Sequence, residues 1–332
     1  MRRGGILRSL AITLAVLVGL GIIAVVSIYL HVTNKFEAPG PLEAPLQVVL
    51  PAGSGAFDIA DALYEAGVVS DPNVFATGVW LEGTTGALKA GEYEFGAHVS
   101  PAEVMHKLVA GTVVERSLTL AEGLTSVAIV RAVNAAEALL GEVVEVPPEG
   151  SLLPETYRYR HGDTRASIIH RMQAAQQEAL AALWAGRAAD LPLVTPAEAV
   201  VLASIVEKET GIAAERAMVA GVFINRLRRG MPLQSDPTVI YAITGGATDL
   251  GRALSRADLR MESPFNTYRN KGLPPAPIAN PGRASLAAAL QPAQTDALYF
   301  VADGAGGHAF ARTLAEHNRN VARWRALRQE RD

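Results

Sequence analysis

The chain has 332 residues, of which 49% are hydrophobic and 19% are charged, and its formal net charge at pH 7 is −3. This length allows two modest domains and one apolar helix, with enough residues for each domain to bury a core. The near-neutral charge and the lack of a basic cluster argue against a nucleic-acid-binding protein. Because the chain contains no cysteine, disulfides and thiolate chemistry are excluded as well.

An uncharged segment rich in Leu, Ile and Val runs from Ser9 to Leu30. It is long enough to cross a bilayer, which takes about 20 residues. A cleaved signal peptide is the alternative, but its apolar core would be shorter, and no small-residue cleavage pattern follows this segment. We therefore predict a transmembrane helix at 9–30.

The charges on either side of this segment predict its orientation. Three arginines precede it, and only Lys35 closely follows it. By the positive-inside rule, residues 1–8 form a cytoplasmic tail and the rest of the chain lies outside. In a bacterium this makes the protein a single-pass protein of the cytoplasmic (inner) membrane whose main part is periplasmic.

A small module is predicted after a Pro- and Gly-containing linker at 31–45. Residues 46–116 begin with an alternating apolar strand, a glycine turn and an amphipathic helix, followed by a second strand at Ala90–Phe95. Ser100 and Glu103 form a capping box that begins another helix. The strand–turn–helix of 48–63 has a weak echo at 118–133.

The longest informative stretch runs from Thr195 to Tyr241. Thr195, with Pro and Glu in the following three positions, predicts a helix start, and this apolar helix ends in the charged triplet Glu207-Lys208-Glu209. A second helix is expected from Ala213 to about Arg229. An isolated charged triplet is usually a solvated helix end. However, either glutamate could instead be partly desolvated and serve as a general acid, and helical spacing does not decide between them.

The C-terminal third carries further patterns. Apolar residues at Leu298–Ala302 predict a buried strand, with a hairpin partner at Gly306–Phe310 and a final helix to about Gln329. The seven histidines show no metal-ligand spacing, and the chain has no phosphate-binding loop and no nucleophile elbow. We therefore expect no metal and no cofactor.

Several motifs carry a resemblance to a known family. They are ASIVEKET, VFINRL, LQSDPTVIY, FNTY, GLPPAPIANPG, YFVADG, GGHAF and AEHN, in this order. The chain resembles the endolytic murein transglycosylase (MltG, or YceG-like) family over nearly its whole length. The resemblance implies an α+β protein with an N-terminal transmembrane helix, a small LysM-like α/β module at 46–116, and an α+β catalytic domain at 117–332. LysM folds bind glycans that contain N-acetylglucosamine. A module that serves only for packing is the alternative, because the sequence shows no aromatic-rich platform for sugars.

The resemblance also assigns roles to residues. It implies that Glu207, the first Glu of the VEKE motif, is the catalytic acid/base. By resemblance and polarity, five residues are expected to hold the glycan: Gln234, Asp236, Tyr241, Asn266 and Tyr268. The segment EGSLLPETYRY resembles a further family signature, with Ser151 and Leu152 where an aromatic residue is usual and Glu155 in place of Asp.

The implied activity is cleavage of the MurNAc–GlcNAc bond of nascent peptidoglycan strands, with formation of 1,6-anhydroMurNAc, which would end strand elongation. Peptidoglycan synthases are candidate partners. Two other functions remain open: a membrane-tethered scaffold that binds peptidoglycan without cutting it, and a muramidase that uses water. The intact VEKE motif argues against the scaffold.

Overall fold

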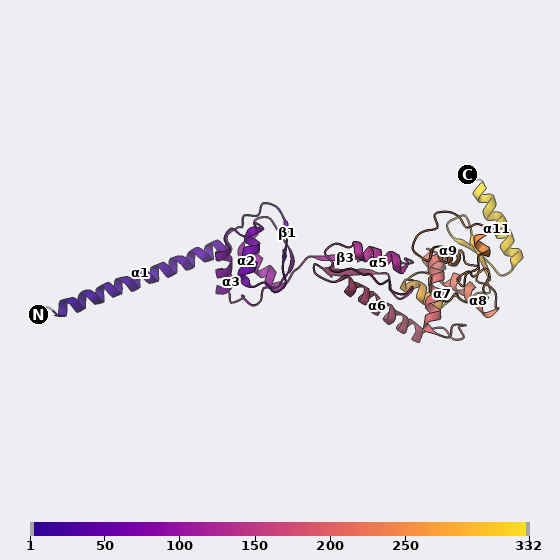
Figure 1. Cartoon of the computed structure of the whole chain (residues 1–332), viewed down its shortest axis with the longest axis horizontal. Coiled ribbons are helices and arrows are strands. Elements are labelled where there is room, and N and C mark those ends of the chain that lie inside the picture. The colour runs from indigo at the N-terminus through magenta and orange to yellow at the C-terminus, as the bar shows by residue number, and fades with distance from the viewer. Residues whose placement is uncertain (1–2, 330–332) are drawn as a thin grey trace. The chain divides into compact units, whose positions relative to one another are not determined.

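A computed structural model describes residues 3–329 and gives a mixed α+β fold (Figure 1). The chain forms two compact units. The first consists of residues 1–116 and 160–162, and the second of residues 117–159 and 163–332. The predicted α+β class and N-terminal apolar helix are confirmed, and each unit is described by itself below.

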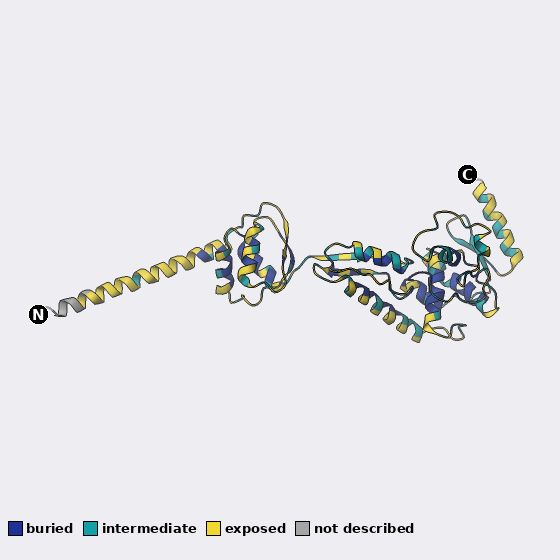
Figure 2. Cartoon of the chain, viewed as in Figure 1, coloured by how far each residue is buried: buried dark blue, intermediate teal, exposed yellow. Residues whose placement is uncertain are grey.

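The apolar N-terminal segment lies within one long helix, α1 (Arg3–Glu37). An 18-residue window of this helix has a mean hydropathy of 2.7, and nearly all of the helix's described side chains before Val32 are exposed, as the yellow ribbon in Figure 2 shows. By length and composition this helix could cross a membrane. It contains the span predicted at 9–30.

The first part of the predicted linker is helical, so the prediction of a linker beginning at residue 31 needs correction. Val32 and Phe36, one helical turn apart, are buried in the core of the first unit. The Phe36 ring packs 6.3 Å from that of Phe75, and an added Cβ on Gly78 would lie only 2.3 Å from Phe36. This packing extends the helix to Glu37 despite the proline and glycine that follow.

The first unit packs three helices against a two-stranded sheet. Strand β1 (Leu46–Leu50) pairs antiparallel with β2 (Gly91–Phe95), with Leu46 opposite Phe95. The helices are α2 (Ala56–Glu65), α3 (Pro72–Leu81) and α4 (Pro101–Ala110). The predicted capping box is present at the start of α4, where Ser100 and Glu103 bond to each other's backbone. A relationship of this unit to LysM domains stays a prediction.

The strand–turn–helix echo found in the sequence corresponds to two segments of the same local structure. In the first, β1 is followed by α2; in the other, β3 (Glu115–Thr119) is followed by α5 (Ser126–Ala135). Each turn holds a glycine in the left-handed region, Gly53 at φ +86° and Gly123 at φ +78°. Only glycine adopts this conformation without strain, which explains why this residue matches in both segments.

The second unit contains mostly helices. Besides β3 and α5, its elements are β4 (Thr156–Arg160), α6 (Arg165–Ala185), α7 (Pro196–Glu209), α8 (Arg216–Arg228), α9 (Asp236–Thr244), α10 (Arg283–Leu290), β5 (Tyr299–Ala302), β6 (His308–Ala311) and α11 (Leu314–Gln329), with 3₁₀ turns at Ala213–Glu215 and Asp258–Arg260. Strand β3 pairs with β4, and β5 pairs antiparallel with β6, as the predicted hairpin requires.

Helix α7 is at the centre of the second unit. Its residues from Ala199 to Val206 are all buried, and α8 and α10 pack closely against it. The predicted capping box at Thr195 is present. An apolar helix packed on all sides can end only where its backbone reaches polar partners. The charged triplet therefore lies where the core gives way to polar loops.

Two details differ from the sequence predictions. The helix expected from Ala213 begins with a 3₁₀ turn, and the α-helix proper starts at Arg216, whose side chain reaches back to α7. The strand expected to be buried, β5, is only half-buried. It belongs to a two-stranded hairpin, so α11 covers it incompletely.

Candidate active site

The two glutamates of the triplet lie on opposite sides of the end of α7. Positions two apart in an α-helix are separated by about 200° around its axis. Glu207 points to the loop before α10 and to the start of α8, whereas Glu209 points to the residues that precede α9. The sequence left both glutamates as candidates, and the structure gives them different surroundings.

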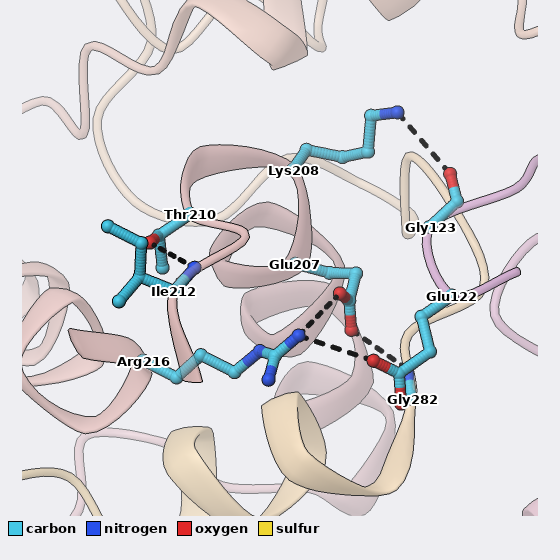
Figure 3. Close-up of polar contacts among 8 residues, drawn as sticks. All are labelled: Glu122, Gly123, Glu207, Lys208, Thr210, Ile212, Arg216 and Gly282. Carbon is cyan, nitrogen blue, oxygen red and sulfur yellow. Dashed lines mark hydrogen bonds and ion pairs between the residues drawn. The ribbon is translucent and has the colours of Figure 1, made fainter. Parts of the chain in front are cut away.

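The Glu207 side is a closed cluster of charges (Figure 3). One carboxylate oxygen accepts the backbone N–H of Gly282 at 3.0 Å, and the other lies 3.5 Å from the Arg216 guanidinium. Arg216 also pairs with Glu122 at 3.2 Å. The Glu207 side chain is only 5% exposed. Both of its contacts, a guanidinium and a backbone N–H, are hydrogen-bond donors.

Burial, and then the neighbouring charge of Glu207, raise the pKa of Glu122 above its ordinary value. The guanidinium of Arg216 opposes this rise. Two carboxylates therefore share one cation, and Glu122, with its side chain 40% exposed, is the one more open to solvent.

The Glu209 side is a pocket. The Ser235 hydroxyl donates a hydrogen bond to Glu209, and among the described residues no cation lies in ion-pair contact with this carboxyl. Burial raises the pKa of Glu209 to about 7, with a smaller contribution from the charge of Asp236. Ser235 and the charges of His308 and Arg226 oppose the rise. A carboxyl of this kind can both give and take a proton near neutral pH.

The pocket beside Glu209 has a volume of about 360 Å³ and collects polar and aromatic side chains from several elements. Its lining comprises Glu209, Arg226, Leu233, Gln234, Asp236, Tyr268, Tyr299, Phe300, Leu314 and His317. Three of the five residues predicted to hold the glycan, Gln234, Asp236 and Tyr268, therefore lie together around Glu209 rather than around Glu207.

The geometry of these three residues is fixed by their neighbours. The Tyr268 hydroxyl donates to the Asp236 carboxylate at 2.6 Å. Gln234 has a left-handed backbone at φ +53°, and its N–H is held by the carbonyl of Thr267 at 3.1 Å. A non-glycine residue in this conformation costs about 1 kcal/mol or more, and such strain gathers at functional sites.

The other two predicted binding residues, Asn266 and Tyr241, do not line this pocket. Asn266 is fully buried; its amide donates to the carbonyls of Leu259 and Met261, and its oxygen accepts the N–H of Tyr268. It therefore holds the loop that presents Tyr268. Tyr241 packs 5.0 Å from Phe265 and lines a separate cavity of about 520 Å³.

Two residues at the pocket had no assigned role in the sequence analysis. Arg226 is 7% exposed, donates to the carbonyls of Leu298 and Leu233, and lies over the ring of Tyr299. His317 stacks on the same ring, and burial lowers its pKa, which favours the neutral imidazole. Both belong to motifs that the sequence displayed, VFINRL and AEHN. For Arg226, the signal in the sequence was a charged residue among the apolar residues of VFINRL.

Within residues 3–329, no group of three His, Asp or Glu side chains forms an arrangement that could hold a metal ion. Another cavity, of about 460 Å³, lies between α6, α7 and the Pro-rich segment 275–277. Its walls are mainly apolar, and neither Glu207 nor Glu209 lines it. The pocket beside Glu209 combines the carboxyl of Glu209, whose pKa is raised, with polar groups around it.

Comparisons with known proteins show which family the chain belongs to. The model of the YceG-like family matches residues 48–323. An endolytic murein transglycosylase of Bacillus subtilis is 30% identical over 86% of both chains. One from Streptococcus pneumoniae is 31% identical over 83% of this chain, which spans 57% of that longer protein. The crystal structure of a YceG-like protein of Listeria monocytogenes, 30% identical, superposes with a TM-score of 0.51 and covers 83% of this chain and 99% of that one.

The chain belongs to the YceG-like family. Relatives named endolytic murein transglycosylase match most of its length, and the chain is an enzyme of the lytic transglycosylase class, a lyase.

Proposed function

We propose that this enzyme cleaves peptidoglycan glycan strands within the chain, between MurNAc and GlcNAc, and leaves a 1,6-anhydroMurNAc end. The substrate follows from the relatives, which are endolytic murein transglycosylases. The observation that carries the chemistry is the carboxyl of Glu209, whose pKa burial raises to about 7 and which lines a polar pocket.

We assign the acid/base to Glu209, although the family resemblance alone suggested Glu207. Glu207 is 5% exposed and occupied by Arg216 and the Gly282 N–H, so a glycosidic oxygen would have to displace these contacts. Glu209 has one hydroxyl donor, Ser235, and it opens on the pocket that holds Gln234, Asp236 and Tyr268. The role of Glu207 in catalysis stays a prediction that the experiments below test.

The proposed reaction needs one carboxyl acting twice. Protonated Glu209 gives its proton to the glycosidic oxygen, the bond from C1 of MurNAc to that oxygen breaks, and GlcNAc leaves with a free hydroxyl. The C6 hydroxyl of the same MurNAc then bonds to C1, and ionised Glu209 takes its proton. The carboxyl is restored, and no water is consumed. Ser235 and the nearby charge of Arg226 favour the ionised form that exists between the two steps.

A muramidase is the second candidate because the pocket contains another carboxylate, Asp236. Hydrolysing glycosidases use two carboxyl groups, one as acid and one as base or nucleophile. In this structure Asp236 accepts a hydrogen bond from Tyr268. We propose that Asp236 orients Tyr268 toward the sugar and raises the pKa of Glu209. A scaffold without activity would have no use for a carboxyl tuned toward neutral pH.

Mass spectrometry of glycan strands digested by the purified enzyme tests this function. Anhydro ends support a lytic transglycosylase, reducing MurNAc ends would establish a muramidase, and intact strands would establish a scaffold. Glu209→Gln should leave the strands intact. Glu178→Gln, which changes an exposed glutamate on α6, should cut as the unchanged enzyme does.

We also propose that α1 anchors the enzyme in the cytoplasmic membrane, with the N-terminus in the cytoplasm and both units in the periplasm. The first unit would then hold glycan near the membrane, where synthases extend it. Full-length protein that needs detergent for release from membranes supports the anchor. A chain cleaved after Leu30 in its native host would contradict it.

A further inference from the structure

Glu207 belongs to the closed cluster with Arg216, Glu122 and Gly282, and the catalytic assignment leaves it without a role. We propose that Glu207 is a positioning residue, which acts through Arg216 and the N–H of Gly282 to fix the end of α7 and thereby the direction of Glu209. This inference rests on the proposed function, because it concerns the same reaction.

The contacts of Glu207 connect three segments that the chain brings from far apart. Glu207 belongs to the last turn of α7, Arg216 is the first residue of α8, and Gly282 caps α10 (Figure 3). Through Arg216 the cluster also includes Glu122, in the loop after β3. A helix end that leaves its backbone groups unpaired would fray, and this cluster gives it fixed neighbours.

Glycines around the cluster let the backbone lie close to the side chains of Glu122 and Glu207. An added Cβ on Gly282 would lie 1.8 Å from the Glu122 carboxylate, and one on Gly123 would lie 3.3 Å from the Cγ of Glu207. Gly123 has a left-handed backbone, and its N–H donates to the carbonyl of Asn280 at 2.9 Å. Lys208, between the two glutamates, reaches the Gly123 carbonyl at 3.4 Å. The loop of Glu122 therefore closes against the end of α7 from one side.

The opposite side of the same turn presents Glu209 to the pocket. Only Thr210, the C-cap, and a short connection separate this turn from the 3₁₀ turn before α8. Loss of the Glu207 contacts would leave the last turn of α7 held by its apolar side, by the contact of Lys208 with the Gly123 carbonyl and by the hydrogen bond from Ser235 to Glu209. A displacement of about 1 Å in a catalytic group can cost about 100-fold in rate. Glu207 thus influences the reaction without touching the substrate.

The test compares kcat, KM, pH profile and thermal melt for three variants of the full chain. Glu207→Gln keeps the shape and an acceptor for Gly282 but loses the ion pair with Arg216. Arg216→Gln removes the cation. Arg283→Gln is the matched control, since it breaks an exposed ion pair with Glu155 next to the same helix start.

We expect Glu207→Gln and Arg216→Gln each to lower kcat by between about 10- and 100-fold, with little change in KM. The part of the pH–kcat profile that reports the ionisation of Glu209 should be retained. The double variant should lose about as much as either single variant, because the two residues act as one unit. Arg283→Gln should leave kcat unchanged.

Three outcomes would overturn the inference. A folded Glu207→Gln that is as inactive as Glu209→Gln would make Glu207 the acid/base. Loss of the pH dependence of kcat in this variant would have the same meaning. A lower melting temperature with unchanged kcat per folded molecule would make the cluster merely structural. Losses that multiply in the double variant would separate the two residues. Failure of the proposed function is distinguishable, because it shows as the wrong product ends in the unchanged enzyme.

Discussion

The two sides of the end of α7 treat a buried carboxyl in opposite ways. Glu207 has a guanidinium and a backbone N–H, so its charge is compensated where it lies. Glu209 has a single hydroxyl donor, Ser235, and faces a pocket. Donors beside a buried carboxyl favour its ionised form, whereas burial with a single hydroxyl donor raises its pKa, as at Glu209. Two residues of one motif can therefore serve different purposes.

The largest effect that would test this contrast is expected from Glu209→Gln. Glutamine keeps the size of the side chain but cannot exchange a proton, so the rate of glycan cleavage should fall by at least about 10²- to 10⁴-fold. Release of anhydromuramoyl products under single-turnover conditions measures this loss. A folded Glu209→Gln with a near-normal rate would move the chemistry off this side of the helix.

The same substitution should stabilise the protein at high pH. Because the folded-state pKa of Glu209 is raised from 4.5 to about 7, the folded state loses stability as pH rises between these values and is penalised fully above pH 7. Glu209→Gln removes this penalty, which is at most on the order of 3 kcal/mol. Thermal melts should show a higher melting temperature than the unchanged enzyme at pH 8 and no difference at pH 4. A lower melting temperature at pH 8 would contradict an uncompensated carboxyl.

A smaller change is expected from Asp236→Asn. The charge of Asp236 raises the pKa of Glu209, so its removal should lower that pKa and move the alkaline limb of the pH–kcat profile to lower pH. An unchanged limb would mean that the two carboxyls do not interact. If Asp236 instead served as a hydrolytic base, the variant would lose activity at every pH.

No effect is expected from chelation. On neither side of α7 do the described residues form a group that could hold a metal ion, and the proposed proton transfers need no Lewis acid. Product release should be equal with and without EDTA. A loss that added divalent ions restore would contradict this prediction.

The sequence could predict the elements better than the contacts between them. The capping boxes at Ser100 and Thr195 depend on residues three positions apart, so local rules suffice to find them. The choice between Glu207 and Glu209 depends on which direction from α7 meets a cavity, and that is decided by α8, α9 and α10 together. Helical spacing gives the two directions but not what lies there.

Asn266 shows the same limit at a single residue. Its polarity suggested a sugar contact, but its amide is used by carbonyls of the loop that starts near Leu259. Whether an asparagine faces solvent or holds a loop depends on backbone groups that are remote in any local pattern. Gln234 and Tyr268 have similar polarity, and they line the pocket.

The packing of the end of α1 into the core of the first unit limits how far this unit can move from the membrane span. Val32, which is buried in that unit, comes within one helical turn of Leu30, the predicted end of the membrane span. The helix continues to Glu37 without a break, about 10 Å beyond Leu30. Under the proposed topology the core of the first unit therefore lies at a fixed distance from the lipid headgroups, because a continuous helix and not a flexible linker connects it to the span. Such a helical connection would restrict the first unit to glycan strands in the layer next to the bilayer.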